Sequence, residues 1–435
     1  MKLTEIKDKE FQKIADKSPQ ITFHQTKAWA LLKGSNGWLH YYIALKENDT
    51  SHACALLLAK KIPIINKYIF YSPRGFLIDY NNKEILKIFT KEIKNFIKKK
   101  KGIFIKIDPY VSYIEHDNNG KIVENGENNI KSYQNLIDLG YKHFGFNLMQ
   151  DTLQPRWMHV IDTKNKTLDD IMKDMESKTR QILRKNEKCG ITIREIKKDE
   201  LKIFKDIMKH TSDRREFIDR PLSYYENMWK YLQEEGIIKI MLAEINFDKY
   251  KENTNKELIE IKEELKNRKE KYEKNMLKMN EKKYKQKNKQ DEESIDRLNK
   301  QLEKIKEYKK EYGKKTTLGG ILFLIYGNEV LSLLGGSEAK LMQFQSAYST
   351  HFAGIKYAVE NNYEKYNFYG ITGDFKEENP LYGLYLFKKS FGGKVVELIG
   401  EFDLIINKPL YYAYKLSFNF YHKAKNIKNK LQGNK

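Results

Sequence analysis

Two apolar stretches decide the fold: GIIKIMLAEI at residues 236–245 and TLGGILFLIYGNEVLSLLGGS at residues 317–337. Short apolar runs next to glycine are typical of strands that are buried on both faces. The second stretch is interrupted by Asn328 and Glu329, so it falls short of the roughly 20 apolar residues that a membrane-spanning helix needs. We therefore predict two strands within it, joined by a turn at Gly327 and Asn328, in the same sheet as the first stretch.

A highly charged segment separates these stretches. Residues 246–315 contain no proline and no glycine before Gly313, and residues 248–315 carry 23 basic and 16 acidic side chains. Apolar residues recur there at spacings of three, four and seven, which predicts two amphipathic helices. Two narrow stripes separated by a polar connection favour an antiparallel coiled-coil hairpin inserted into the domain. The alternative is a charged, solvated spacer, which needs no periodic stripe. The two stripes are Leu258, Ile261, Leu265, Tyr272, Met276 and Met279, then Ile295, Leu298, Leu302, Ile305, Tyr308 and Tyr312.

The rest of the chain alternates strands with helices, which predicts an α/β fold. Each half passes from a pair of strands to a helix and then to a strand that ends in a polar loop, so we expect a duplicated unit. The first unit is predicted over residues 1–150 and the second over 151–245 and 317–405. The arm is predicted over 246–316, and a basic C-terminal helix over 406–435.

Composition restricts the class of protein. The 435 residues include 81 Lys and Arg against 59 Asp and Glu, a net charge of +22, so an acidic partner is expected: nucleic acid, an anionic membrane or a phosphorylated substrate. A hydrophobic content of 40% excludes a disordered basic tail. Two distant cysteines and nine scattered histidines exclude a disulfide scaffold and make a metal site improbable. The N-terminal residues show no secretory pattern, so a cytosolic location is expected.

No phosphate-binding GxxxxGK loop, GxGxxG fingerprint, HExxH or GxSxG motif occurs, which argues against common hydrolase and kinase chemistry. Basic and aromatic clusters remain. FHQTKAWALLKG is predicted to place Phe23, Trp29 and Lys33 on a short amphipathic helix, where Lys33 could equally be an ordinary lysine beside apolar surface. Arg220 lies four residues before Tyr224 at the start of a helix, an arrangement compatible with anion binding.

Three further clusters have both a functional and a structural interpretation. Gly335, Gly336 and Ser337 follow a buried strand and allow a ligand to approach the backbone closely. The pair Phe387 and Lys388 lies on a short aromatic helix and could also be surface decoration. A stripe of basic residues on one helix face could hold phosphates or simply be solvated. The stripe is Arg180, Arg184 and Lys188.

Taken together, these segments resemble the Fem family of aminoacyltransferases, which build the interpeptide bridge of peptidoglycan. The resemblance runs in order from about residue 20 to residue 405. It rests on FHQTKAWALLKG, YSPRGFL, IKIDP, DTLQPRW, KTRQILRKNEKCGI, the Arg220 and Tyr224 pair, LGGS and LYLFKKSFGG. It implies two GNAT-like α/β units with a helical hairpin inserted in the second. It also implies aminoacyl-tRNA as donor, with no other cofactor, and a muropeptide precursor as acceptor.

The resemblance assigns roles to single residues. Lys33, Arg220 and Tyr224 match positions that hold the precursor's phosphate and stem, and Phe387 and Lys388 match a pair near the tRNA acceptor end. Lys388 is expected to stabilise the charge of the tetrahedral intermediate or of the tRNA 3′ phosphate. Asp108, at the end of the strand IFIKIDP, is the candidate base, and its alternative role is to cap the turn at Pro109.

One departure bears on the acceptor. Leu334 stands where the branch using UDP-linked precursors carries a tyrosine, which favours a lipid-linked acceptor, lipid II, over a UDP-linked one. The basic, aromatic segment KPLYYAYKLSFNFYHKAKNIKNK is consistent with docking at the anionic inner face of the membrane, or with a helix packed on the body. The arm is expected to contact the donor or another Fem-type subunit.

Two rival classes remain. A non-catalytic nucleic-acid-binding or scaffold protein would explain the charge and the arm, but it leaves Phe387, Lys388 and LGGS without a role. An acyl-CoA N-acyltransferase of the same fold should carry a Q/R-x-x-G-x-G/A loop at the start of a helix, and none is found.

Overall fold

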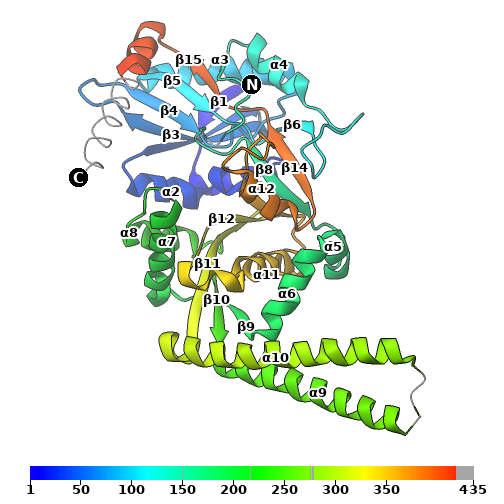
Figure 1. The fold of residues 1–435 in the computed structure, drawn as a ribbon. Helices are drawn as coiled ribbons and strands as arrows, with labels where there is room; N and C mark the ends of the chain where they lie inside the picture. The colour runs from blue at the N-terminus through cyan, green and yellow to red at the C-terminus, as the bar shows by residue number, and fades with distance from the viewer. Residues whose placement is uncertain (150, 216, 275, 277–278, 418–435) are drawn as a thin grey trace.

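The computed structural model describes residues 1–149, 151–215, 217–274, 276 and 279–417. The body contains two mixed sheets, and a long helical arm projects from the second (Figure 1). The first sheet has seven strands in the order β1-β2-β3-β4-β5-β15-β7. They are β1 Lys2–Glu5, β2 Leu39–Glu47, β3 Thr50–Lys61, β4 Tyr68–Ser72, β5 Gly102–Ile107, β7 Lys142–His143 and β15 Phe402–Ile405.

The second sheet has eight strands in the order β6-β14-β8-β13-β12-β11-β10-β9. In each sheet one parallel pair, β4 with β5 and β12 with β13, lies among antiparallel neighbours. The α/β fold with two tandem units predicted from the sequence is therefore confirmed. The strands are β6 Ser112–Glu115, β8 Trp157–Asp162, β9 Ile191–Glu195, β10 Ile238–Asn246, β11 Lys315–Tyr326, β12 Glu329–Ser337, β13 Lys365–Gly370 and β14 Lys394–Leu398.

Helices cover both faces of the sheets. They are α1 Asp8–Ala15, α2 Lys27–Ser35, α3 Lys83–Lys99, α4 Ile130–Asp138, α5 Leu168–Asp174, α6 Ser177–Lys188, α7 Leu201–Arg215, α8 Leu222–Leu232, α9 Phe247–Glu273, α10 Glu281–Tyr312, α11 Ser346–Glu360 and α12 Tyr382–Lys389, with short 3₁₀ turns at η1 Phe23–Gln25, η2 Lys198–Glu200 and η3 Ala339–Phe344. Residues 408–417 are also helical, so the predicted C-terminal helix begins two residues later than residue 406, and residues 418–435 lie outside the described residues.

The central strands are apolar on both sides because each side meets a different core. On β11, Leu322 and Leu324 face a core shared with α7 and α8, while Phe323 packs into a second core with α11. Alternate side chains of a strand point to opposite faces, so a doubly covered strand needs a continuous apolar run. The predicted strands β10, β11 and β12, and the turn at Gly327 and Asn328, are confirmed.

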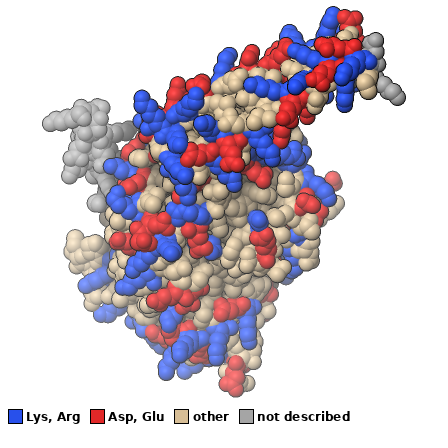
Figure 2. Space-filling view, turned by 90° about the horizontal axis from the view of Figure 1, so that it is seen from below, with Lys and Arg blue, Asp and Glu red and all other residues tan. Residues whose placement is uncertain are grey.

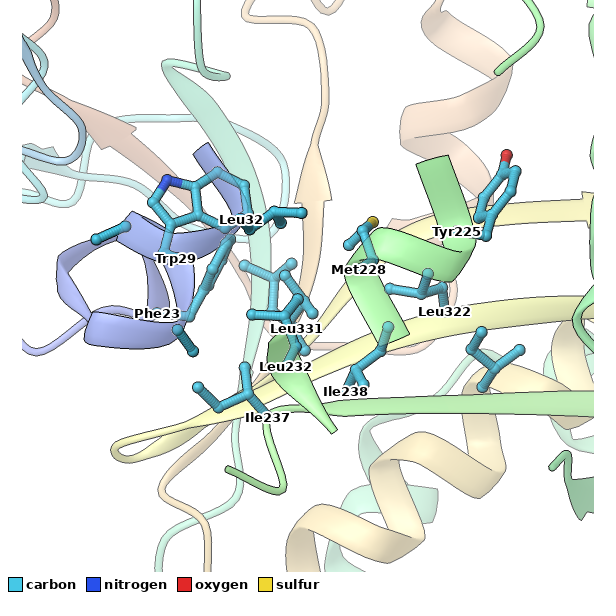
Figure 3. Close-up of a cluster of buried hydrophobic side chains, with 14 of the residues drawn as sticks. Phe23, Trp29, Leu32, Tyr225, Met228, Leu232, Ile237, Ile238, Leu322 and Leu331 are labelled. Atoms are coloured by element: carbon cyan, nitrogen blue, oxygen red, sulfur yellow. The ribbon is translucent and has the colours of Figure 1, made fainter. Parts of the chain in front are cut away.

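One apolar core joins the two units. It contains Phe23, Trp29 and Leu32 from the first unit and Met228 and Leu232 of α8 from the second. Figure 3 shows these side chains converging between α2 and the strands of the second sheet. Burial of large side chains on both sides fixes how the units sit against each other, at roughly 25 cal/mol per Å² of apolar surface removed from water.

The two sheets also exchange strands. The short strand β6, from the first part of the chain, pairs with β14 in the second sheet. In return, β15 from near the C-terminus pairs antiparallel with β5, with Phe402 opposite Ile107, in the first sheet. A single cut in the sequence therefore cannot separate the strands of the first sheet from those of the second.

The arm consists of α9 and α10, which leave and re-enter the second sheet through β10 and β11. Leu258, Leu265, Leu298 and Ile305 are the buried members of its two stripes. Figure 2 shows Lys and Arg interleaved with Asp and Glu along the arm, so this face carries no continuous basic stripe. Among the described residues, no helix is long and apolar enough to cross a bilayer.

One local prediction is wrong. Phe23 does not share a helix with Trp29 and Lys33, because Thr26 ends the 3₁₀ turn and starts α2. The Thr26 hydroxyl donates to the Phe23 carbonyl at 2.8 Å and accepts from the Trp29 N–H at 3.1 Å. A threonine that caps a helix in this way defines the first turn, so the helix begins at Lys27.

Candidate functional site

A cluster of buried polar side chains lies at the seam where the C-terminal ends of β4 and β5 meet the second unit. Asp108 follows β5 and is buried. Its carboxylate accepts the backbone N–H of Arg74 at 2.7 Å and the hydroxyl of Tyr71 at 3.1 Å. Burial raises the pKa of Asp108 to about 7 against the opposing charge of Arg74. The carboxyl therefore ties β4 to β5 and can exchange a proton near neutral pH.

Arg74 supplies the positive charge of this cluster. It adopts φ 59°, a left-handed conformation that non-glycine residues rarely hold. Its guanidinium is buried, donates to the Pro155 carbonyl at 3.0 Å and lies 5.5 Å from the centre of the Tyr110 ring. Arg74 thus joins the first unit to the segment that leads into β8.

Tyr369 approaches the cluster from the second unit. It has φ 64° and lies where the pairing of β13 with β8 is irregular. Its N–H donates to Asn367 Oδ1 at 2.7 Å, and its hydroxyl bonds to Gln154. Burial raises the pKa of Tyr369 to about 12, with opposing effects from Arg74 and Asp108, so the phenol stays protonated. Strained residues held by their neighbours are concentrated at functional sites.

Lys388 lies behind this strained strand. It is 7% exposed, and its ammonium donates to the carbonyls of Phe368 and Gly370, on either side of Tyr369, at 2.7 Å each. Burial lowers the pKa of Lys388 to about 7. The neighbouring Phe387 packs 4.9 Å from the ring of Tyr348 in an aromatic cluster with α11. Lys388 is therefore anchored to the backbone that presents Tyr369.

Lys33 and Arg220 come from different units and meet at one end of the seam, where α2 packs against α8. The Lys33 ammonium lies 4.4 Å from the centre of the Trp29 ring, and the Arg220 guanidinium lies 5.4 Å from that of Tyr224. Burial, and then the charge of Arg220, lower the pKa of Lys33. Within the described residues neither cation has a recorded carboxylate partner, so the pair can accept an anion.

His24 connects the cation pair with the carboxyl cluster. Burial, and then the charges of Arg74 and Lys33, lower its pKa well below the ordinary value, so this imidazole is neutral at pH 7. The imidazole of His24 is thus within electrostatic range of Lys33 on one side and of Arg74 in the carboxyl cluster on the other.

The segment Gly335-Gly336-Ser337 is paired with β11 inside β12, whereas the sequence predicted that it follows the strand. It ends β12 beneath α7, where the Ser337 N–H donates to Thr211 Oγ1 at 3.2 Å. A Cβ on Gly336 would lie 2.5 Å from the same hydroxyl oxygen. These small residues let α7 approach the strand closely, and their recorded contacts are with α7 and β11 rather than with Lys33 or Asp108.

The basic stripe on α6 is divided among different contacts. Arg180 bonds to the carbonyls of Met172 and Met175 at the end of α5. Lys188 pairs with Glu257 of the arm at 3.2 Å, and Arg184 is exposed. In the described parts of the chain no group of three or more His, Cys, Asp or Glu side chains is placed to hold a metal ion.

Sequence reasoning selected Asp108, Lys33, Arg220 and Lys388 but did not single out several seam residues. Arg74 and Gln154 lie in the quoted stretches YSPRGFL and DTLQPRW, and an arginine directly before a glycine in a turn was the available signal. Tyr369 gave no signal, because its φ and its partners depend on strand pairing. The residues that were missed are His24, Tyr71, Arg74, Gln154 and Tyr369.

Known proteins are similar to this chain over nearly its whole length. The model of the FemAB family matches residues 6–418. The aminoacyltransferase FemA of Staphylococcus epidermidis is 33% identical over 417 residues, which cover 95% of this chain and 98% of that protein. FemA of Staphylococcus aureus is 32% identical over 416 residues, with 95% and 97% covered. The crystal structure of FemX matches with a TM-score of 0.78 and 29% identity, covering 95% of this chain and 99% of that one.

Proposed function

The chain belongs to the FemAB family, and from this premise we propose that it transfers an amino acid from aminoacyl-tRNA to the stem-peptide amine of a peptidoglycan precursor. The observation that carries the proposal is the pair Lys33 and Arg220, two cations from different units without a recorded carboxylate partner in the described chain. Such a pair suits the phosphates of a precursor, and it lies on the same seam as a carboxyl that titrates near neutrality.

In the reaction, a neutral amine of the acceptor attacks the ester carbonyl of the aminoacyl-tRNA. A C–N bond forms, the ester C–O bond breaks, the nitrogen loses a proton and the ribose oxygen gains one. Asp108 in its ionised form can accept the proton from nitrogen, directly or through the Tyr71 hydroxyl that it binds. With a pKa of about 7, it holds that form in about half of the molecules at neutral pH.

The intermediate carries a negative oxygen, which needs nearby donors. An ammonium has three N–H donors, and the carbonyls of Phe368 and Gly370 accept two of those of Lys388. We assign to Lys388 the charge that opposes the oxyanion and the positioning of Tyr369. Phe387 supports Lys388 through the aromatic cluster with α11.

Lys33, Arg220 and Tyr224 hold the acceptor in this proposal. A lipid-linked precursor is favoured over a UDP-linked one because Leu334 replaces the aromatic residue expected beside a UDP group. The segment Gly335-Gly336-Ser337 of β12 then contributes by letting α7, and the Arg220 loop that follows it, approach the strand. The arm, with 23 basic and 16 acidic side chains, is assigned to donor binding or to contact with another Fem-type subunit.

The test is a transfer assay with purified protein, total aminoacyl-tRNA and lipid-linked or UDP-linked muropeptide, read by mass spectrometry. The expected product is the muropeptide with one added aminoacyl residue, formed faster from the lipid-linked acceptor. Acetyl-CoA in place of charged tRNA should give no product. Tight tRNA binding without any product from either acceptor would instead favour a non-catalytic RNA-binding protein.

A further inference from the structure

The hairpin between β3 and β4 exposes two isoleucines at its tip. In the tip sequence IPIINK, residues 62–67, Ile64 is 106% exposed and Ile65 is 39% exposed relative to reference values. Ile64 also has φ 75°, which is unusual for a β-branched side chain. Packing in the described body does not explain this conformation, since the Ile64 side chain is fully solvated. An exposed, strained apolar tip is expected to serve an external contact.

A run of lysines lies beside this tip. The sequence KKKK at residues 98–101 ends α3 and leads into β5. The carbonyl of Lys101 accepts the N–H of Tyr68, at the base of the hairpin, at 3.1 Å. Lys98, Lys99 and Lys101 are exposed, whereas Lys100 pairs with Glu5 at 3.0 Å. Positive charge therefore flanks the apolar tip.

The helix at residues 408–417 belongs to the same end of the sheet. The N–H of Ile406 donates to the Ile103 carbonyl at 3.0 Å, and Tyr411 packs into a small core with residues at the base of the hairpin. On its outer side Tyr412 is 52% exposed and Leu416 is 60% exposed. Figure 1 shows this helix, in red, above the ends of the strands of the first sheet.

This end of the molecule is also connected with the seam. The ammonium of Lys60, the last residue but one of β3, donates to the Asn36 carbonyl at 2.9 Å. The Asn36 N–H in turn donates to the carbonyl of Lys33 at 3.0 Å. Lys33 is thus one helical turn away from the rim of the surface that bears the exposed isoleucines.

We propose that these residues form a membrane-docking face, in which Ile64 and Ile65 enter an anionic lipid bilayer and the surrounding lysines contact its headgroups. Aliphatic side chains that enter the acyl boundary and lysines near anionic lipid both favour binding, and two such signals together give stable attachment. RNA is the less suitable occupant, since it binds basic side chains and aromatic stacking surfaces and would leave the fully exposed aliphatic Ile64 at the tip without a role. The face consists of Lys61, Ile64, Ile65, Lys98, Lys99, Lys101, Tyr412 and Leu416. The inference does not depend on the proposed transferase activity.

The direct experiment is flotation of the full chain with vesicles of phosphatidylcholine alone or with phosphatidylglycerol added. We expect binding to the anionic vesicles, at least tenfold tighter than to the neutral ones. Ile64→Asp with Ile65→Asp should weaken the binding to anionic vesicles at least tenfold, and Lys98→Glu with Lys99→Glu should do the same. The matched control is Ile122→Asp, an isoleucine that is 64% exposed in the segment after β6 and should leave binding unchanged.

A second measurement reports insertion itself. Both native cysteines, Cys54 and Cys189, are buried, so an Ile64→Cys variant can be labelled selectively with an environment-sensitive dye. The dye should shift to the blue on addition of anionic vesicles, whereas a dye at Ile122→Cys should not. All variants should retain the wild-type thermal melt, because the side chains removed are solvated.

Three results would overturn the proposal. The first is equal affinity for neutral and anionic vesicles, or none for either. The second is a tip variant that binds as well as wild type. The third is loss of tRNA affinity in the lysine variant with unchanged flotation, which would identify an RNA-binding surface. Transfer to a water-soluble acceptor should be unaffected by the tip variants, so a failure of docking and a failure of the transferase proposal can be told apart.

Discussion

The seam between the two sheets and the arm carry their charges in opposite ways. In the seam, Asp108, Arg74 and Lys388 are buried, and two non-glycine residues hold left-handed backbone. In the arm, most charges are exposed, and pairs such as Lys285 with Glu281 at 2.7 Å lie one helical turn apart. A buried charge costs several kcal/mol in desolvation, whereas an exposed i,i+4 pair contributes about 0.3–0.5 kcal/mol. Burial of the charged groups in the seam therefore lowers the free energy of unfolding of the protein.

This difference indicates that the seam carries out the chemistry and that the arm extends the protein toward a binding partner. A polar cluster that is kept despite its cost in stability has a function that needs it. The arm obtains its order from a narrow apolar stripe and from Arg268, whose guanidinium pairs with Asp291 at 2.6 Å between the two helices. Changes in the seam should alter turnover strongly, and changes in the arm should alter binding.

The largest expected effect is that of Asp108→Asn. Removing a general base typically lowers the rate about 10²–10⁴-fold, so turnover should fall at least about a hundredfold. Asparagine has nearly the same shape and keeps an oxygen to accept the Arg74 N–H. Single-turnover transfer assays measure this effect, and a wild-type rate in the variant would remove Asp108 from the mechanism.

The same variant provides a control on folding. Because the pKa of Asp108 is raised from 3.8 to about 7, the folded state binds more protons than the unfolded state between these values. The stability that this carboxyl contributes is thus present at low pH and is lost as the pH rises through about 7. Asp108→Asn should melt at a higher temperature than wild type at pH 8, and the gain should shrink at pH 5. An equal loss of stability at both pH values would instead indicate a damaged fold.

Lys388→Met is expected to lower turnover by at least an order of magnitude. The variant fills the same space but leaves the carbonyls of Phe368 and Gly370 without their donor, and it removes the charge that opposes the oxyanion. Lys389→Met, at the next position of α12, is the matched control and should retain activity. If both variants behave alike, the buried ammonium has no special role.

Lys33→Ala and Arg220→Ala should each raise the acceptor KM several-fold while turnover changes less. Groups that hold a phosphate bind ground state and transition state alike, so their loss appears in KM. Lys230→Ala is the control. The Lys230 ammonium also lies over an aromatic ring, 5.1 Å from the centre of Tyr231, and both residues are on α8. An unchanged acceptor KM in both test variants would place the precursor elsewhere.

Shortening the arm should have the smallest effect on stability. Its root must be kept, because Phe247 and Tyr250 pack with Phe344 of the body. Gln301 Nε2 donates to Thr254 Oγ1 at 3.1 Å, so these two residues can be joined by a short Gly-Ser linker that replaces residues 255–300. We expect a cooperative melt within a few degrees of wild type and a weaker affinity for aminoacyl-tRNA.

Unchanged tRNA affinity, salt dependence and oligomeric state in the shortened chain would mean that the arm is only a spacer. A lower turnover at saturating donor would contradict the division of roles between the arm and the seam, because the linker lies far from Asp108 along the arm.

The sequence predicted the elements whose signal is local. The strands β10 to β12 were recognisable because a strand covered on both faces must be continuously apolar, and the stripes of the arm reappear as its buried residues Leu258, Leu265, Leu298 and Ile305. The exchanged strands β6 and β15 were not recognisable, since four residues are too short to show a period. Their pairing depends on partners far away in the chain.

The site shows the same limit. Asp108 could be selected because a carboxylate after a buried strand is a local pattern. The hydrogen bond between the Arg74 N–H and the Asp108 carboxylate could not be predicted, because it joins segments that follow two different strands. Likewise, the sequence around Tyr369 does not reveal that the Lys388 ammonium donates hydrogen bonds to the carbonyls of the two neighbouring residues.

The pH dependence of single-turnover transfer tests the central claim, that the seam performs the chemistry, most directly. With saturating aminoacyl-tRNA and a lipid-linked acceptor, the wild-type rate divided by the Asp108→Asn rate should rise with pH as Asp108 ionises, with a midpoint near its pKa of about 7. The ratio isolates Asp108, because the loss of the Lys388 charge, whose pKa is also about 7, lowers both rates alike. In Asp108→Asn the rising limb should disappear, and the low rate that remains should fall as Lys388 loses its proton. The same rising limb in both proteins, or a ratio of the two rates that is independent of pH between 5 and 8, would contradict the account.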